Sequence, residues 1–335
     1  MGNAIKSKTI DIAFVFDDKF SDLFRVAIYS IAKNTKSNLA VHIVDCGIAE
    51  QNKDLIRKFI SEFKNISSVE FKVPKRIEVL ESYTIPTHFS TAIFYRLGIP
   101  KIFPELSRVI YLDCDIIAVG DISELWNEDL DGRPLGVIEE DGNFFNTKTK
   151  LRKMQEINLP ENKHYYNSGV LLIDSKQFEK SQIFERVVDF VKNTDLKLSC
   201  PEQDAMNLCL DDDEHMALDP KYNFIPFASS SEECLKKIKE PIIIMHYAGK
   251  KPWEVNKKII RFAASCGMEK YHMSMMLKYW EYADYIDKKK FSNGNIFQTL
   301  KFLYKCLFQP IEKFISRKCC HFQKSLFGQR KKKVH

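Results

Sequence analysis

The chain has 335 residues, of which 44% are hydrophobic and 12% aromatic, enough for one large domain with or without an appendage. It contains no run of 18 uncharged apolar residues and no paired cysteine spacing of the zinc-site kind, so we expect neither a membrane-spanning helix nor a zinc module. The net charge of +6 is uneven, because residues 288–335 carry 13 basic residues against one glutamate and residues 1–287 are left with −6.

Strand-like and helical segments alternate along the first part of the chain. Apolar β-rich runs occupy 10–16, 40–44 and 69–73, and apolar residues at helical spacing mark 23–31 and 50–63. This alternation predicts an open α/β sheet, in which ligands bind at the carboxyl ends of the strands. Asp17 follows the first strand directly and is therefore expected at that edge.

The remaining elements continue the same pattern. In chain order we expect a helix over 91–97, a strand over 109–112, an apolar run over 116–119, a helix start at 121–126, strands over 135–138 and 170–173, helices over 178–191 and 205–210, and a core strand over 242–245. The last strand ends in His246, and the strand over 109–112 ends in Asp113.

Two carboxylates, Asp113 and Asp115, stand between buried-type apolar runs. Two unpaired charges near a core cost several kcal/mol or so, and no lysine or arginine follows Arg108 within the run. A bound cation is the natural partner, and Mg²⁺ or Mn²⁺ suits oxygen ligands. The alternative is that one aspartate caps the next segment and the other is solvated, which the tripeptide alone would favour.

Five short motifs occur in a fixed order between residues 10 and 253. They are Asp17-Asp18, Asp113-Cys-Asp115, Asn167-Ser-Gly-Val-Leu-Leu-Ile, Glu202-Gln203-Asp204, and His246-Tyr-Ala-Gly249 followed by Lys251-Pro-Trp. Together they resemble family 8 of the retaining glycosyltransferases, a group that includes bacterial lipopolysaccharide glucosyltransferases and lipooligosaccharide galactosyltransferases. The resemblance implies a GT-A (Rossmann-like) mixed sheet flanked by helices, a UDP-sugar donor and Mn²⁺, with Mg²⁺ as the alternative ion.

The resemblance also implies roles for individual residues in binding the nucleotide and the ion. Asp113, Asp115 and His246 match metal ligands, and Asp17 matches the position that bonds the uracil. Gly249 and Lys251 match a loop that clamps the diphosphate, with Lys250 as a substitute cation. A lone histidine at a strand end is more often a core residue, but its place before Gly249 and Lys251 favours the ligand interpretation.

A second set of implied roles concerns the sugar. Arg96 and Asn167 resemble sugar-contacting positions, and Gln203 resembles the residue on the β face of the donor sugar. We predict Gln203, Glu202 and Arg96 as the catalytic set. Because an amide is a poor nucleophile, the resemblance favours a front-side reaction in which the departing phosphate oxygen helps to deprotonate the acceptor. The structural alternatives are a surface helix arginine for Arg96 and a turn residue for Asn167.

Three points of the alignment are open. Glu202 stands where many family members have aspartate, which puts the contact to the sugar hydroxyls and the identity of the sugar in question. Gly249 and Lys251 enclose one residue instead of two, and either Glu140 or Asp141 holds the acidic sugar-binding position.

The C-terminal part of the chain has a different character. We divide the chain into a catalytic domain over 1–265 and a helical basic region over 266–335. Between 296 and 314 apolar residues recur every three or four positions with lysines between them, and Pro310 should kink the helix. This pattern predicts a basic amphipathic helix lying on an anionic membrane, in preference to a packing helix or a nucleic-acid patch.

The expected function follows from these parts. We expect a metal-dependent retaining transferase that moves glucose or galactose from UDP to a glycan or lipid-linked acceptor, such as a lipopolysaccharide core precursor. It would work in the cytoplasm at the inner face of the membrane and bind no nucleic acid. The start of the chain lacks the apolar segment of a signal peptide, in keeping with that location. The alternative is a non-catalytic UDP-sugar-binding module associated with the membrane.

Overall fold

The structure is a computed structural model that describes residues 9–77, 91–140, 147–226, 240–249, 251–255, 260–261 and 270–286. The chain separates into two compact units, Met1–Gly249 and Lys250–His335. The division at residue 265 expected from the sequence stays a prediction, since residues 262–269 are not among those described. Over the described part of the chain, no helix combines the length and apolar character needed to cross a membrane.

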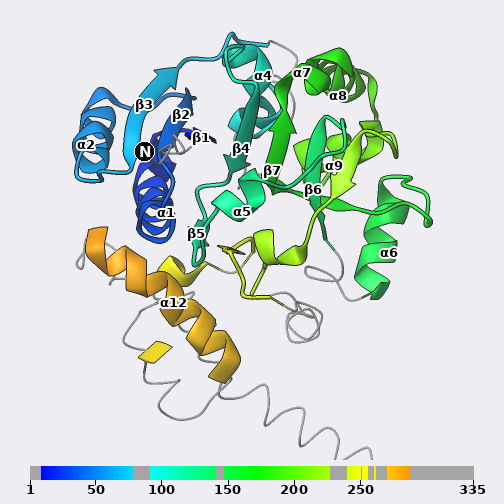
Figure 1. The fold of residues 1–335 in the computed structure, drawn as a ribbon. Coiled ribbons are helices and arrows are strands. Elements are labelled where there is room, and N and C mark those ends of the chain that lie inside the picture. Colours follow the sequence, from blue (N-terminus) through cyan, green and yellow to red (C-terminus); the bar gives the residue numbers. More distant parts are fainter. Residues whose placement is uncertain are drawn as a thin grey trace, which may run out of the picture. The chain divides into compact units, whose positions relative to one another are not determined.

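A mixed seven-stranded sheet lies at the centre of the first unit, in the order β3-β2-β1-β4-β7-β6-β8 (Figure 1). Its strands are β1 (Ile10–Phe16), β2 (Leu39–Asp45), β3 (Ile66–Lys72), β4 (Arg108–Leu112), β6 (Leu135–Glu139), β7 (Tyr166–Asp174) and β8 (His215–Ala217). The first four strands run parallel, whereas β7 runs antiparallel to β4 and to β6. This confirms the expected GT-A-type α/β fold.

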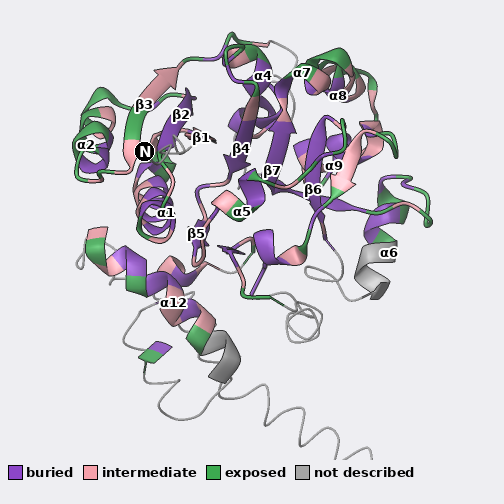
Figure 2. Cartoon of the chain, viewed as in Figure 1, coloured by how far each residue is buried: buried purple, intermediate pink, exposed green. Residues whose placement is uncertain are grey.

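Helices flank the sheet and cover its apolar strands. They are α1 (Ser21–Asn34), α2 (Glu50–Ile60), α4 (Ile99–Ile102), α5 (Ser123–Trp126), α6 (Thr147–Glu156), α7 (Ser175–Lys180), α8 (Ile183–Asn193) and α9 (Pro201–Cys209), with 3₁₀ turns η1 (Asp18–Phe20), η2 (Thr91–Arg96) and η3 (Pro220–Tyr222). Every residue of β2 is buried, and β7 is buried along almost its whole length (Figure 2). Strands covered on both faces explain the continuous apolar runs of the sequence.

Some predicted elements differ from the observed ones. The segment over 178–191 is not one helix, because Gln182 adopts a left-handed conformation (φ 52°) between α7 and α8. The segment over 91–97 is the 3₁₀ turn η2, and β7 begins at Tyr166 instead of residue 170. The earlier start places Asn167 and Ser168 inside a strand at the centre of the sheet.

A small antiparallel ribbon stands apart from the main sheet. It pairs β5 (Ile116–Ala118) with β9 (Ile244–His246), in a register that sets Ile116 opposite His246. The strand expected over 242–245 therefore pairs with β5 and not with the central sheet. This pairing brings His246 beside the residue that follows Asp115.

In the second unit the structure describes η4 (Pro252–Glu254) and α12 (Lys270–Ile286). The ring of Trp253 lies 5.0 Å from that of Tyr279, so the 3₁₀ turn packs on the helix. Residues 287–335 are outside the described part of the chain, and the amphipathic helix expected there stays a prediction.

Candidate active site

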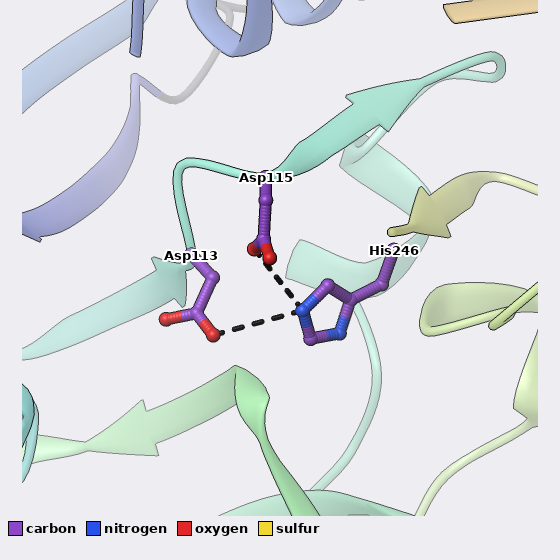
Figure 3. Close-up of side chains that lie close together, drawn as sticks. All are labelled: Asp113, Asp115 and His246. Atoms are coloured by element: carbon purple, nitrogen blue, oxygen red, sulfur yellow. Dashed lines mark ion pairs between the residues drawn. The ribbon is translucent and has the colours of Figure 1, made fainter. Parts of the chain in front are cut away.

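Three potential metal ligands converge where β4 ends (Figure 3). Asp113 and Asp115 lie on the turn from β4 to β5, and His246 is the last residue of β9. His246 Nε2 lies 3.2 Å from Asp115 Oδ1 and 3.7 Å from Asp113 Oδ2, and one ligand atom of each residue lies within 4.8 Å of the others. The structure thus brings together the three residues predicted to bind metal, which we call the cation site.

The donor set of the cation site suits a divalent ion. Two carboxylates and one imidazole nitrogen are acceptable to Mn²⁺. The other ring nitrogen of His246, Nδ1, lies 2.9 Å from the side-chain oxygen of Asn223, and the contact is buried. A metal-binding histidine commonly donates its second N–H in this way, which leaves the first nitrogen free for the ion.

Gly169 on β7 makes the cation site sterically feasible. A Cβ atom at this position would lie 2.3 Å from His246 Cε1 and 2.8 Å from Asp113 Oδ2. Both distances are shorter than carbon contacts allow, so any side chain here would push apart two members of the site. Sequence reasoning assigned no role to this glycine, although it stands in the Asn167-Ser168-Gly169 motif.

Arg96, at the end of η2, is buried and is not a surface arginine. Its guanidinium donates to Ser168 Oγ at 2.9 Å and to the Ser168 carbonyl at 3.0 Å. It also lies 3.3 Å from Asp113 Oδ1 and 3.4 Å from Glu202 Oε2. Burial alone would lower the pKa of Arg96, but Asp113 and the other nearby acidic groups raise it above its ordinary value. Arg96 therefore stays charged and links the cation site to Glu202.

Glu202 and Gln203 lie in the first turn of α9, which begins at Pro201. Glu202 is 2% exposed, and its Oε2 accepts a hydrogen bond from Ser168 Oγ at 2.9 Å. Its other oxygen, Oε1, is buried and has no hydrogen-bond partner among the described residues. Burial raises the pKa of Glu202 to about 7, although Arg96 opposes the shift. A buried acceptor without a donor is unusual, and a donor from a bound molecule would satisfy it.

Gln203 joins two other predicted sugar-site residues. Its Nε2 donates to Glu140 Oε2 at 2.7 Å, and its Oε1 accepts from Asn167 Nδ2 at 3.2 Å. Burial raises the pKa of Glu140 to about 7, against the effect of the Gln203 hydrogen bond. Asn167 is a buried strand residue and not a turn residue. The structure thus places Glu140 beside Gln203, whereas Asp141 lies outside the described residues.

Three further residues, Asp17, Gly249 and Lys251, are predicted to contact the nucleotide. Asp17 follows β1, is half-buried, and accepts a hydrogen bond from the Lys19 amide at 3.1 Å. Gly249 has φ 90°, a conformation that favours glycine. Lys251 belongs to the second unit, where its Nζ lies 5.5 Å from the centre of the Trp253 ring. Their contacts to uracil and diphosphate stay predictions.

Three further residues complete the site and carried no assigned role in the sequence. The Tyr111 hydroxyl donates to Asp113 Oδ1, Ser168 connects Arg96 with Glu202, and Asn223 accepts from His246. Ser168 could have been found from its place in the Asn167 motif. Asn223 stands alone after η3, and nothing in the local sequence marks it.

The chain is similar in sequence to several known proteins. The chain is 28% identical over 251 residues to the lipopolysaccharide glucosyltransferase WaaO of Escherichia coli K12, covering 73% of this chain and 72% of that protein. It is 26% identical over 276 residues to general stress protein A of Bacillus subtilis 168, covering 76% and 90% of the two chains.

A solved structure of the galactosyltransferase LgtC, in complex with donor and acceptor sugar analogs, has a similar fold. The TM-score is 0.66 at 21% identity, over 83% of this chain and 97% of that chain. The family description "Glycosyl transferase family 8" matches residues 11–257, which hold all ten predicted site residues. Because this match covers most of the sequence, the chain belongs to glycosyl transferase family 8.

Proposed function

We propose that the protein is a metal-dependent retaining hexosyltransferase that moves glucose or galactose from a UDP-sugar to a cell-surface glycan precursor such as the lipopolysaccharide core. The observation that carries the proposal is the convergence of Asp113, Asp115 and His246 at the carboxyl end of β4. This is the sheet edge where α/β proteins bind ligands. The glycosyltransferase names of several relatives, among them a lipopolysaccharide glucosyltransferase, support the choice of reaction.

The leaving group explains why such a reaction needs the cation site. A UDP-sugar departs as a diphosphate, and negative charge grows on its oxygens as the glycosidic bond breaks. A divalent ion, Mn²⁺ or Mg²⁺, held by Asp113, Asp115 and His246 would neutralise that charge. Asp17 would bond the uracil, and Gly249 and Lys251 would hold the diphosphate.

The sugar would lie against Glu202, Gln203 and Asn167. Glu202 Oε1 lacks a partner among the described residues, and a sugar hydroxyl would supply the missing donor. Arg96 holds the other oxygen of this carboxylate from 3.4 Å, which fixes the direction of Oε1. Because Glu202 is one methylene longer than aspartate, the hydroxyl it reaches helps to decide between glucose and galactose.

The chemistry of Gln203 bears on how the configuration would be retained. Its amide makes hydrogen bonds to Asn167, Ser168 and Glu140 and is a poor nucleophile. We therefore propose front-side attack, in which the acceptor hydroxyl passes its proton to the departing phosphate oxygen. Gln203 would then stabilise the positive charge that develops on the sugar.

The test is release of UDP from UDP-glucose and UDP-galactose, with a lipopolysaccharide-core acceptor, in Mn²⁺ or in EDTA. We expect turnover in Mn²⁺ alone and its loss in the double variant Asp113→Asn, Asp115→Asn. Asp131→Asn makes the same chemical change in an exposed turn and should turn over like the wild type. Turnover in EDTA, or full activity of the double variant, would refute the proposal. Tight UDP binding with no transfer to any acceptor would favour a binding module instead.

A further inference from the structure

Buried side chains form an unbroken hydrogen-bonded line from the cation site to Glu140. From one end to the other, the line runs from His246 Nδ1 to Asn223 Oδ1 (2.9 Å), Asn223 Nδ2 to Asn167 Oδ1 (2.8 Å), Asn167 Nδ2 to Gln203 Oε1 (3.2 Å) and Gln203 Nε2 to Glu140 Oε2 (2.7 Å). We call Asn223, Asn167 and Gln203 the amide line. Asn223 is 1% exposed, so bulk solvent does not reach its side chain.

The direction of the amide line is fixed by two backbone groups of β7. The oxygen and nitrogen of an amide side chain have nearly the same shape, so only their partners tell them apart. The Gly169 N–H lies 2.9 Å from Asn167 Oδ1, and the Ser168 N–H lies 3.1 Å from Gln203 Oε1. A backbone N–H can only donate, so the atom facing it in each amide is the oxygen.

The orientation of Asn223 follows from that of Asn167. Because Asn167 presents its oxygen to Asn223, Asn223 must present its NH₂ group in return. Its own oxygen then faces His246, and an oxygen can only accept. The proton of the neutral His246 ring therefore belongs on Nδ1, and the lone pair of Nε2 points at Asp113 and Asp115.

The two nearby carboxylates, Asp113 and Asp115, favour the opposite tautomer of His246. In the absence of a cation, Asp115 Oδ1 lies 3.2 Å from His246 Nε2 and would favour a proton on that nitrogen. A proton on Nε2 would stand where the ion must bind. Asn223 supplies a competing acceptor on the other side of the ring.

We propose that Asn223 is a positioning residue that keeps the His246 proton on Nδ1 and so holds Nε2 ready for a divalent cation. The inference rests on the proposed cation site, which it deepens. Asn223 receives its direction from Asn167 and, through it, from the β7 backbone. The strand that carries a sugar-site residue thereby also orients a metal ligand.

The first experiment needs no metal. In metal-free protein labelled with ¹⁵N-histidine, recorded at a pH high enough for the imidazole to be neutral, long-range ¹H–¹⁵N spectra show which ring nitrogen carries the proton, and His246→Ala identifies the signal. We expect Nδ1–H in the wild type, and a wild type with Nε2–H would overturn the inference without any variant. In Asn223→Ala we expect the proton on Nε2.

The second experiment is Mn²⁺ affinity, from the electron paramagnetic resonance signal of the free ion. Loss of such a partner to a metal-binding histidine costs 10–100-fold in affinity, and we expect a loss of about this size in Asn223→Ala. Asn65→Ala, which removes an amide bonded to the Ala32 and Thr35 carbonyls far along the chain, should bind Mn²⁺ as the wild type does.

The two results separate the failure of this inference from failure of the proposed function. If the wild type binds no Mn²⁺, the cation site itself is refuted, whatever the position of the proton. If it binds Mn²⁺ and folded Asn223→Ala keeps both Nδ1–H and the wild-type affinity, Asn223 does not position His246. If Asn223→Ala does not fold, the wild-type spectrum decides, since Nε2–H in the folded wild type overturns the inference on its own.

Discussion

Arg96 shows how a single residue balances the negative charges of the candidate active site. It lies between Asp113, which is half-buried, and Glu202, which is buried as Arg96 is. Removing one partner of a buried ion pair leaves an uncompensated charge, which costs about 3–5 kcal/mol. The same argument explains why Glu140, which has amide partners but no lysine or arginine ion pair among the described residues, has a raised pKa.

The buried carboxyl of Glu140 should make the stability of the protein depend on pH. Its pKa rises from 4.5 to about 7 on burial, so the folded protein binds this proton more tightly than the unfolded chain. The stabilising contribution is present below pH 4.5 and is lost as pH rises through 7, by about 3 kcal/mol at most. In Glu140→Gln, which cannot ionise, the free energy of unfolding of the metal-free protein should fall less between pH 5 and pH 8.

Urea denaturation at each pH measures the effect. The neighbouring Glu139→Gln is the matched control, because Glu139 pairs with the exposed His164 and is only half-buried. It should keep the pH dependence of the wild type. An equal pH dependence in Glu140→Gln and the wild type would mean that Glu140 does not titrate in this range.

The residues predictable from the sequence are those whose role is set by strand ends and short spacing. Asp113, Asp115 and His246 follow apolar runs, and the structure brings them together. Asn223 could not be predicted, because its role depends on lying opposite both Asn167 and His246 in the folded chain. The choice between Glu140 and Asp141 likewise depends on the register of β6 against β7, which local sequence does not specify.

At the scale of elements, the antiparallel strand β7 is decisive. Its first residues, not its last, meet the carboxyl end of β4, since the Asp113 amide donates to the Gly169 carbonyl at 2.8 Å. The α/β alternation predicts the parallel strands well. It gives no sign of α6 or β8, because α6 is largely polar and β8 has no buried residue.

The contact between α6 and α9 gives the second prediction. Lys153 Nζ lies 2.7 Å from Asp204 Oδ2, and both residues are buried. Lys153→Met would leave the Asp204 charge without its counter-ion and should lower the free energy of unfolding by about 3 kcal/mol. Because Asp204 follows Gln203 on α9, the variant should also weaken donor binding.

Chemical denaturation measures the loss of stability. Lys163→Met is the matched control, since its partner Asp212 is largely exposed, and it should cost less than about 1 kcal/mol. Equal losses in the two variants would show that the buried Lys153–Asp204 pair stabilises the protein no more than the exposed pair does.

On the scale of the whole molecule, the charge of the chain is divided. Residues 1–287 carry −6 and residues 288–335 carry +12, and every predicted metal and donor ligand lies at or before Lys251. The tail therefore has no expected part in donor binding. Its lysines and arginines each add about 1 kcal/mol near an anionic membrane.

The third prediction concerns removal of residues 288–335. The shortened protein should unfold at the wild-type temperature and bind Mn²⁺ and UDP with wild-type affinity, but it should no longer bind anionic vesicles. Binding of the full chain should weaken as salt screens the lysines. Vesicle sedimentation and calorimetry measure the two properties.

A full-length variant with glutamine at 330–333 is the control for charge. It should bind vesicles more weakly than the wild type and more strongly than the shortened protein. If the shortened protein unfolds or loses UDP affinity, the tail packs on the catalytic unit and the membrane interpretation is wrong.

The pairing of β5 with β9 has a consequence for the order in which the protein is made. Asp115 and His246 are about 130 residues apart, and they meet only after Ile116 has paired with His246. Contacts this distant in sequence form late, since a long loop must close, at a cost in chain entropy, before the contacts can stabilise the fold. A nascent chain that has emerged only as far as β8 would hold both aspartates but no histidine ligand. The ability to capture a metal ion would therefore mark the end of synthesis and folding of the catalytic unit.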